Sequence, residues 1–468
     1  MIKPLLSLVL AASTCFPQLS DAAVGNPPSK PNFVFMLIDD MGATDGVCFG
    51  SRFYQTPNLS RLAAQGMRFT SAYAACAVCS PTRAAIMTGK APARLHITDW
   101  IPGEGTPKQS RFRVPDWQQH LPLEEVTIAE ALKALGYATA SIGKWHLGGT
   151  NFSPQQQGFD VNVAGGHIGS PASYFWPYGD PRASHRVPGL AEQGGEAGEY
   201  LADRLTDEAL KFIQASKGKP FFLYLPHYSV HAPLMGKEEI IDEYRDRPGV
   251  NGQSNKVYAA MIQSVDDSVG RIMRKLEDLN LTERTVFIFT SDNGGAVHFG
   301  QPPATGNAPL RLGKGYAYEG GLRVPLLVKV PWLTQPGSVC DVPVISHDWF
   351  PTLLELAGAR ASAAVSALDG LSMVPLLKGR DRLKRKELFW HYPHYWFRSV
   401  VTPYSVARVG DWKLIRFYED DREELYDLRT DPGEANNLAV KDPGKRRQLG
   451  ARLDAWLKEI GAQMPVPR

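Results

Sequence analysis

The 468-residue sequence is poor in cysteine, in net charge and in long apolar segments. It contains five cysteines, and its 51 lysines and arginines nearly balance 48 acidic residues, for a formal net charge of +3. This balance indicates neither a nucleic-acid-binding tract nor a polybasic membrane patch, so any anion site must come from local charge. After the amino-terminal segment, no apolar run reaches the roughly 18 residues of a membrane helix. We expect no nucleic-acid partner and no membrane span.

The first 23 residues have the layout of a secretory signal peptide. Lys3 precedes an apolar run at residues 5–12, and small residues follow as far as Ala23. A basic, then apolar, then small-residue order predicts export from the cytoplasm. The protein is therefore expected to be secreted or periplasmic. The residues before Cys15 make a poor lipoprotein motif, so a lipid anchor is not expected.

The body of the chain alternates apolar strands with amphipathic helices. With 43% hydrophobic residues, the chain can fill one large core and a smaller one. Four apolar runs each end in polar residues, and parallel strands buried on both faces have this pattern. We predict an α/β fold, with a large, mostly parallel sheet flanked by helices over residues 24–379. The expected strands are 32–38, 138–142, 220–225 and 286–290, and the expected helices are 123–135, 201–216 and 258–279.

The pattern changes after about residue 379. An aromatic run at 387–397 precedes a predicted hairpin of strands 405–409 and 412–418, joined at a glycine turn. A further strand at 424–428 and a helix at 445–460 follow. We predict a smaller antiparallel α+β subdomain over residues 380–468.

The segment 77–89 carries the most distinctive motif. Pro81 suits the first position of a helix and Ser80 suits the N-cap, which places Cys79 at the mouth of that helix. Free backbone N–H groups and the positive end of the helix dipole attract an anion there, and Arg83 adds a fixed charge. The motif therefore predicts an anion site beside a cysteine.

Cys76 and Cys79 also form a C-x-x-C pair, which leaves thiol chemistry open. A redox pair of this kind follows a strand in a small domain, and a zinc site needs a second ligand pair, which we do not find. An oxidising compartment also permits a disulfide. The sequence does not pair Cys48, Cys76 and Cys340.

Hard oxygen ligands follow two of the predicted strands. Asp39 and Asp40 end the first strand, and Asp292 and Asn293 follow the last one. Carboxylate and amide oxygens suit Ca²⁺, or Mg²⁺, and argue against a soft thiolate site. Alone, either pair would more often be a cap or a turn. Because ligands gather at the carboxyl edge of such sheets, we predict a divalent-metal site there.

Two further strand ends deliver lysine and histidine. Lys144 and His146 lie two residues apart, so an extended chain would project them in the same direction. A buried lysine is costly unless it meets an anion. His231 follows the third strand, whereas Lys314 lies in a glycine-rich segment after the fourth.

These motifs together resemble the sulfatase family, cysteine subtype. Cys79-x-Pro-x-Arg83, followed by four residues and Thr-Gly, is similar to its signature, and residues 143–148 resemble its second signature. Matching segments extend from residue 32 to 325. The resemblance implies an alkaline-phosphatase-like fold and oxidation of Cys79 to formylglycine by a maturation enzyme. It also implies a metal site made by the modified Cys79 with Asp39, Asp40, Asp292 and Asn293.

The resemblance also implies roles for the remaining residues. A hydroxyl of the hydrated aldehyde at position 79 would attack sulfur while the metal, Lys144 and Lys314 neutralise the sulfate. His231, with Lys314, would serve the leaving group. His146 would deprotonate the remaining hydroxyl, so that the covalent sulfate is expelled and the aldehyde returns.

The substrate prediction is a carbohydrate sulfate at a chain end. Aromatic runs at 174–178 and 389–397 could stack on sugars, with His391 and His394 bonding hydroxyls, or could simply pack the two parts together. The segment that carries Arg94, His96 and Asp99 resembles one in bacterial polysaccharide sulfatases, and these three could reach the sugar.

We expect a 4-sulfated galactose or N-acetylgalactosamine. A phosphomonoester or phosphonate hydrolase of the same superfamily is the nearest alternative. A calcium-dependent glycan-binding protein without catalysis and a secreted thiol oxidoreductase are the others.

Overall fold

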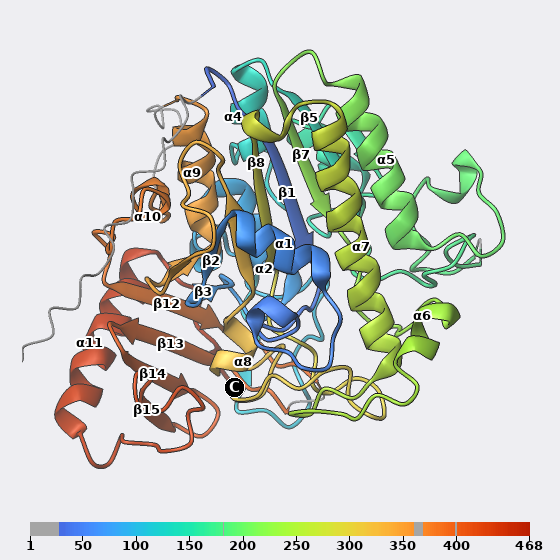
Figure 1. The fold of residues 1–468 in the computed structure, drawn as a ribbon. Helices are drawn as coiled ribbons and strands as arrows, with labels where there is room; N and C mark the ends of the chain where they lie inside the picture. Colours follow the sequence, from blue (N-terminus) through green and yellow to red (C-terminus); the bar gives the residue numbers. More distant parts are fainter. Residues whose placement is uncertain (1–27, 181, 360–367, 398–399) are drawn as a thin grey trace, which may run out of the picture.

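The computed structural model describes residues 28–180, 182–359, 368–397 and 400–468 (Figure 1). The predicted signal peptide and Cys15 lie outside these residues. β1 (Asn32–Ile38) is apolar, is buried on both faces and runs through the middle of an eight-stranded sheet. It pairs in parallel with β7 (Phe221–Pro226) and β8 (Thr285–Ser291). The order across the sheet is β10 (Ser338–Cys340), β2 (Met67–Phe69), β9 (Leu326–Lys329), β8, β1, β7, β5 (Ala138–Ile142) and β6 (Val161–Val163), with β9 antiparallel to both neighbours.

Helices cover both faces of this sheet, as Figure 1 shows. Alternation along β1 sends Val34 and Met36 to one face and Phe33 and Phe35 to the other, and each set belongs to a separate apolar core. The first core includes α1 (Pro57–Gln65), α5 (Leu201–Ala215) and α7 (Lys256–Asp278), whereas the second includes α2 (Cys79–Thr88), α4 (Ile128–Ala134) and α9 (Trp349–Leu356). The predicted fold class is confirmed.

One predicted helix is shorter than expected. We expected a helix over 123–135, but α4 begins only after Thr127. The Thr127 hydroxyl accepts a hydrogen bond from the Glu130 N–H, and the Glu130 carboxylate accepts one from the Thr127 N–H. This reciprocal capping box fixes the start of the helix, although leucines precede it.

The carboxy-terminal part is a separate antiparallel sheet with one covering helix. Its strands lie in chain order and pack through aromatic and aliphatic side chains onto the segments around Tyr73 and Tyr318. The elements are β12 (Glu387–Tyr392), β13 (Tyr404–Val409), β14 (Trp412–Phe417), β15 (Glu423–Asp427) and α11 (Pro443–Glu459). This sheet is the predicted antiparallel one, and the division at residue 379 stays a prediction.

Short elements complete the structure. They are α3 (Pro92–Leu95), α6 (Glu238–Glu243), α8 (Glu319–Leu322), α10 (Val374–Leu377), β3 (Ala72–Tyr73), β4 (Phe112–Arg113), β11 (Val344–Ile345) and β16 (Val466–Pro467). Across the described ranges, no helix combines the length and apolarity that crossing a bilayer would take.

Candidate active site

The ends of β1 and β8 bring four oxygen-bearing side chains together. Asp39, Asp40, Asp292 and Asn293 are all fully buried. Asn293 Nδ2 donates to Asp40 Oδ1 at 2.8 Å, and the Asp40 N–H donates to Asp292 Oδ1 at 3.3 Å. Asp40 has a φ of +63°, so the backbone leaves the strand conformation directly after Asp39. This turn allows both carboxylates to reach one site.

This group fits a divalent cation. Ligand atoms of Asp39, Asp40, Cys79 and His231 all lie within 4.8 Å of one another. Asn293 Oδ1 is buried and has no hydrogen-bond partner in the described structure, so it is an available further ligand. Carboxylate and amide oxygens are the donors that Ca²⁺ and Mg²⁺ prefer. The sequence had not predicted His231 in this group.

Cys79 is the first residue of α2, and Val78 is its N-cap. We expected Ser80 as the N-cap and Pro81 at the first helical position, which is wrong by two residues. The Ser80 hydroxyl is otherwise engaged, because it donates to the His146 carbonyl at 2.9 Å and accepts from the Ile101 N–H at 3.1 Å. Every residue of α2 is buried, and Cys79 Sγ lies 3.7 Å from Asp39 Oδ1.

Arg83 lies one turn after Cys79 and anchors Asp292. Its Nε and Nη2 both donate to Asp292 Oδ2, at 3.0 and 2.8 Å, and its Nη1 donates to the Lys144 carbonyl at 2.8 Å. Although burial opposes it, Arg83 lowers the pKa of Asp292. The guanidinium therefore fixes one predicted ligand and the backbone of Lys144.

Two buried lysines neutralise the two aspartates after β1. Lys144 Nζ lies 2.6 Å from Asp39 Oδ2, and Lys314 Nζ lies 2.8 Å from Asp40. Burial raises the pKa of Cys79, but the charges of Lys144 and Lys314 outweigh it and lower that pKa to about 6. The two lysines therefore favour a negative charge at the N-terminus of α2, beside Cys79.

Cys76 has none of this activation. Burial raises its pKa to about 12, and all four described cysteines are free thiols. A reactive redox pair needs a stabilised thiolate and a partner within bonding reach. Of the two thiols, the structure therefore activates Cys79 alone, and the thiol-exchange interpretation stays a prediction.

A backbone contact fixes which nitrogen of His146 carries the proton. Its Nε2 lies 2.6 Å from the Ile101 carbonyl, which can only accept, so Nε2 carries the proton. Its buried Nδ1 is then an acceptor, and it has no partner among the described residues. Burial and the charge of Lys144 hold the pKa of His146 well below its usual range, which keeps the ring neutral.

The predicted extended chain around Lys144 and His146 is not observed. β5 ends at Ile142, and His146 has a φ of +59°. The two side chains reach the site through this turn and not through strand periodicity. Gly169 packs against the ring, where an added Cβ would lie 2.5 Å from His146 Cε1.

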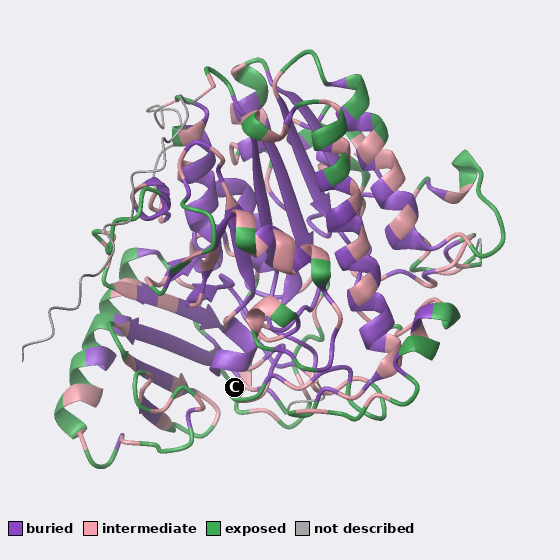
Figure 2. Ribbon diagram, in the orientation of Figure 1, coloured by how far each residue is buried: buried purple, intermediate pink, exposed green. Residues whose placement is uncertain are grey.

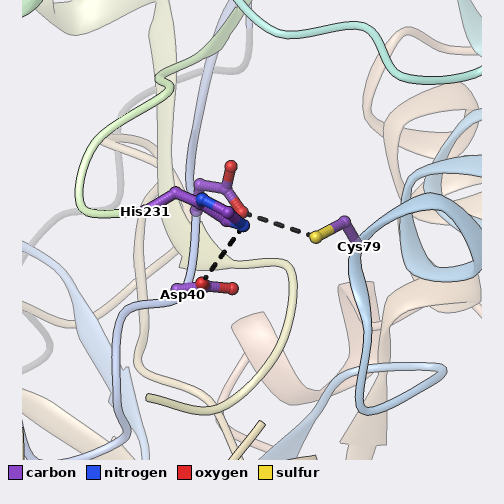
Figure 3. A group of neighbouring side chains, drawn as sticks. Asp40, Cys79 and His231 are labelled. Atoms are coloured by element: carbon purple, nitrogen blue, oxygen red, sulfur yellow. Dashed lines mark hydrogen bonds and ion pairs between the residues drawn. The ribbon is translucent and has the colours of Figure 1, made fainter. Parts of the chain in front are cut away.

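His231 lies between Asp40 and the thiol of Cys79 (Figure 3). Its Nδ1 donates to the Ala232 carbonyl at 2.7 Å, and its Nε2 lies 3.6 Å from Asp40 Oδ2. Burial and Lys314 oppose protonation, but Asp40 and Asp39 raise the pKa of His231 above its ordinary value. The hydroxyl of Tyr174 fixes this segment by donating to the Tyr228 and His231 carbonyls, at 2.6 and 2.8 Å.

A cavity of about 500 Å³ opens onto these groups. Cys79, His146, His231 and Lys314 line it. Its other lining residues include three aromatic side chains, two histidines and one acid, which are Trp100, Phe299, Trp396, His167, His185 and Glu104. The sequence patterns do not predict His167, although it follows β6 at the same edge of the sheet as the other strand ends.

Three predicted sugar contacts do not reach this cavity. Arg94 is paired with Asp369 through Nε and Nη2, at 2.9 and 2.7 Å. His96 Nε2 donates to the Gly461 carbonyl at 3.1 Å. Asp99 is buried and accepts from Tyr392 Oη at 2.8 Å. Their roles beside the sulfate are therefore corrected to structural ones.

Most residues of the two predicted aromatic runs, 174–178 and 389–397, are packed inside the protein. The four tyrosines of the two runs are buried. His391 hydrogen-bonds Ser405 Oγ and the Gln463 carbonyl, and His394 bonds Thr98. Trp396 is the member of these runs that lines the cavity. The packing interpretation holds for the others that are buried.

The comparisons with known proteins agree over nearly the whole chain. Residues 31–359 match the family model described as Sulfatase, and residues 312–463 match the carboxy-terminal model of N-sulphoglucosamine sulphohydrolase. A sulfatase of Formosa agariphila is 32% identical, with 92% of this chain and 89% of that one covered. Human N-acetylgalactosamine-6-sulfatase is 34% identical, with 79% and 72% covered. The crystal structure of Ps i-CgsB with k-i-k-neocarrahexaose is 29% identical, with a TM-score of 0.75 over 91% and 92% of the chains.

Proposed function

The chain belongs to the sulfatase family, whose members are sulfuric ester hydrolases, and from this premise we propose that it desulfates a carbohydrate. The observation that carries the proposal is the set of charged groups that meets at the N-terminus of α2. Cys79, two buried lysines and a cluster of oxygen ligands meet at the floor of a cavity with an aromatic wall. This arrangement suits a small tetrahedral dianion attached to a larger ring.

Two additional groups belong to this proposal. The family generally uses formylglycine and a divalent metal, and we assign the modification to Cys79, where a hydrated aldehyde supplies the attacking hydroxyl. Asp39, Asp40, Asp292 and Asn293 would hold Ca²⁺, or Mg²⁺, which would neutralise charge on the sulfate. The orphan Asn293 Oδ1 supports this ligand set.

Among the residues around Cys79, the lysines stabilise charge on the sulfate and the histidines transfer protons. Lys144 and Lys314 donate to sulfate oxygens from fixed, buried positions, so little reorganisation accompanies the reaction. His146 accepts a proton at Nδ1 from the oxygen at position 79, because its Nε2–H is committed to Ile101.

His231 serves the leaving sugar oxygen. Its Nδ1–H is held by the Ala232 carbonyl, which leaves Nε2 to deliver a proton. Asp40 keeps that nitrogen basic, and Tyr174 holds the backbone of the segment. His146 and His231 thus have opposite roles, because a backbone carbonyl holds Nε2 of His146 but Nδ1 of His231.

The proposed substrate is a sulfated galactose or N-acetylgalactosamine at a chain end, with a preference for the 4-sulfate. Trp396, Trp100 and Phe299 offer stacking surfaces for a sugar ring. One relative is named N-acetylgalactosamine-6-sulfatase and one similar structure holds k-i-k-neocarrahexaose, which supports a sulfated carbohydrate substrate, whereas the preference for the 4-sulfate rests on the sequence prediction. The maturation enzyme and an exported location complete the proposal.

The test is sulfate release from a panel of 4- and 6-sulfated mono- and oligosaccharides, with nitrophenyl sulfate and nitrophenyl phosphate in parallel. We expect release from a galacto-configured sugar sulfate, and loss of all release in Cys79→Ala with the fold retained. Preferred hydrolysis of the phosphate would favour a phosphomonoester or phosphonate hydrolase. Binding of the sugars without release would favour a glycan-binding protein.

A further inference from the structure

The linker between α10 and β12 concentrates positive charge that the overall balance conceals. Residues 378–386 contain six lysines or arginines and one acid, against a net charge of +3 for the whole chain. The linker is largely exposed, as Figure 2 shows between these two elements. Short clusters of lysine and arginine are typical of sites for heparin-like or nucleic-acid polyanions.

Two contacts hold the linker in a defined position. Arg385 donates to Asp348 through both terminal nitrogens, at 2.7 and 2.6 Å, and Asp348 is fully buried. Leu383 packs against the core that contains α9. The backbone is therefore fixed on either side of Lys384.

The other five cations of the linker are unused by the fold. Their side chains are exposed, and in the part of the chain that the structure describes none of them forms an ion pair or a side-chain hydrogen bond. They are Lys378, Arg380, Arg382, Lys384 and Lys386. Neighbouring acids neutralise little of this positive charge, because Asp369 is already paired with Arg94 and Glu387 with Arg452. Asp381 and Glu355 also lie here.

Two hollows meet at this linker and share Lys384. One has a volume of about 960 Å³ and is lined by Arg380, Arg382 and Lys384, and the other has about 460 Å³ and is lined by Lys384 and Lys386. Phe389 and Trp456 line the second hollow, with their rings stacked 5.1 Å apart at 15°. We call the surface formed by Arg380, Arg382, Lys384, Lys386, Phe389 and Trp456 the basic groove.

We infer that the basic groove is a second carbohydrate site, which binds an anionic, sulfated polysaccharide. Spaced cations pair with sulfates along a chain, and half-buried aromatic rings stack on the apolar faces of sugars. None of the six groove residues lines the cavity around Cys79. The choice of a sulfated glycan over another polyanion rests on the proposed function.

A second site changes what the enzyme does with a polymer. The cavity around Cys79 takes one chain end at a time, whereas the groove holds the same polymer through internal residues. Holding raises the local concentration of chain ends, so it lowers the KM for a polymer and leaves small substrates unaffected. The kcat is set at Cys79 and does not change.

The test uses the full chain in two forms. Binding is measured in the Cys79→Ala background by affinity electrophoresis and calorimetry with chondroitin 4-sulfate and a sulfated galactan, so that no turnover interferes. The groove variant combines Arg380→Ala, Arg382→Ala, Lys384→Ala and Lys386→Ala. The matched control removes four other exposed cations of the chain, Lys217→Ala, Lys219→Ala, Lys441→Ala and Arg447→Ala.

We expect the groove variant to bind a sulfated polysaccharide on the order of tenfold more weakly, with a smaller salt dependence, while the control binds normally. Trp456→Ala should weaken binding while the salt dependence stays. In the active form, the groove variant should raise KM for the polymer and leave nitrophenyl sulfate hydrolysis unchanged.

Three results would overturn the inference. They are equal loss of binding in the groove variant and the control, unchanged binding in the groove variant, and equally effective competition by poly-glutamate or DNA. Each of these is read from binding alone. If no sugar sulfate is hydrolysed by the wild type, the proposed function fails while the binding result still stands or falls by itself.

Discussion

Lys413 on β14 joins the carboxy-terminal sheet to the segment that carries Lys314. Replacing Lys413 tests how much this buried contact contributes to the stability of the fold. Its Nζ lies 3.0 Å from Glu319 Oε1 at the start of α8 and 2.7 Å from Glu434 Oε1. All three side chains are buried. Lys413→Met therefore leaves two carboxylates facing each other without their shared cation.

The expected loss is large. Breaking a buried ion pair by removing one partner costs about 3–5 kcal/mol. An unfolding entropy of about 2.1 cal/mol/K per residue gives roughly 1 kcal/mol/K for a chain of this length, so Tm should fall by on the order of 3–5 °C. Arg452→Met, which breaks the exposed pair with Glu387, is the control and should shift Tm by less than about 1 °C.

The loss should also depend on pH. Burial and Glu319 raise the pKa of Glu434 to about 7, against the opposing charge of Lys413. A carboxyl with a raised folded-state pKa adds stability below its unfolded pKa, and that stability is lost as pH rises through the folded pKa. Without Lys413 the pKa of Glu434 rises further, so the Tm gap should be larger at pH 8 than at pH 5.

Calorimetry at both pH values measures the gap. Glu434→Gln in the Lys413→Met background should recover part of the loss at pH 8, because one of the two facing charges is removed. A wild-type Tm for Lys413→Met at pH 8 would refute the reasoning, and so would a gap that is the same at both pH values.

Three further predictions concern the site itself. Asp39→Ala should abolish sulfate release and metal binding, and chelation of the wild type should lower activity until Ca²⁺ is added; full activity in protein shown by metal analysis to be ion-free would contradict this. Gly169→Ala should lower kcat with little change in Tm, because the new Cβ displaces the ring of His146; an unchanged kcat would argue against the role of Nδ1. Cys76→Ala should stay active in the sugar-sulfate assay, and its inactivation with an intact fold would revive the thiol interpretation.

The sequence predicted the central sheet and the polar edge because both depend on local patterns. Apolar runs that end in Asp39, Lys144, His231 or Asp292 are visible one at a time, and parallel topology brings their ends together. The start of α4 could also be read locally, since Thr127 and Glu130 have capping-box spacing.

The errors came from contacts between distant segments. Ser80 looks like an N-cap until His146 and Ile101 occupy its hydroxyl. Arg94 and His96 look free until Asp369 and the Gly461 carbonyl bind them. The backbone turns at Asp40 and His146 likewise have no signal in composition or periodicity. Tertiary partners, and not local preference, decide these positions.

The central claim is that Cys79 becomes the nucleophile of a sulfatase, and the mass of the peptide that contains it tests this most directly. Conversion of the thiol to an aldehyde exchanges H₂S for oxygen, which lowers the peptide mass by about 18 Da relative to unmodified cysteine. We predict this shift in protein purified from a host that contains the maturation system, in proportion to its specific activity on a sugar sulfate. A fully active preparation in which Cys79 carries its unmodified mass would contradict the account.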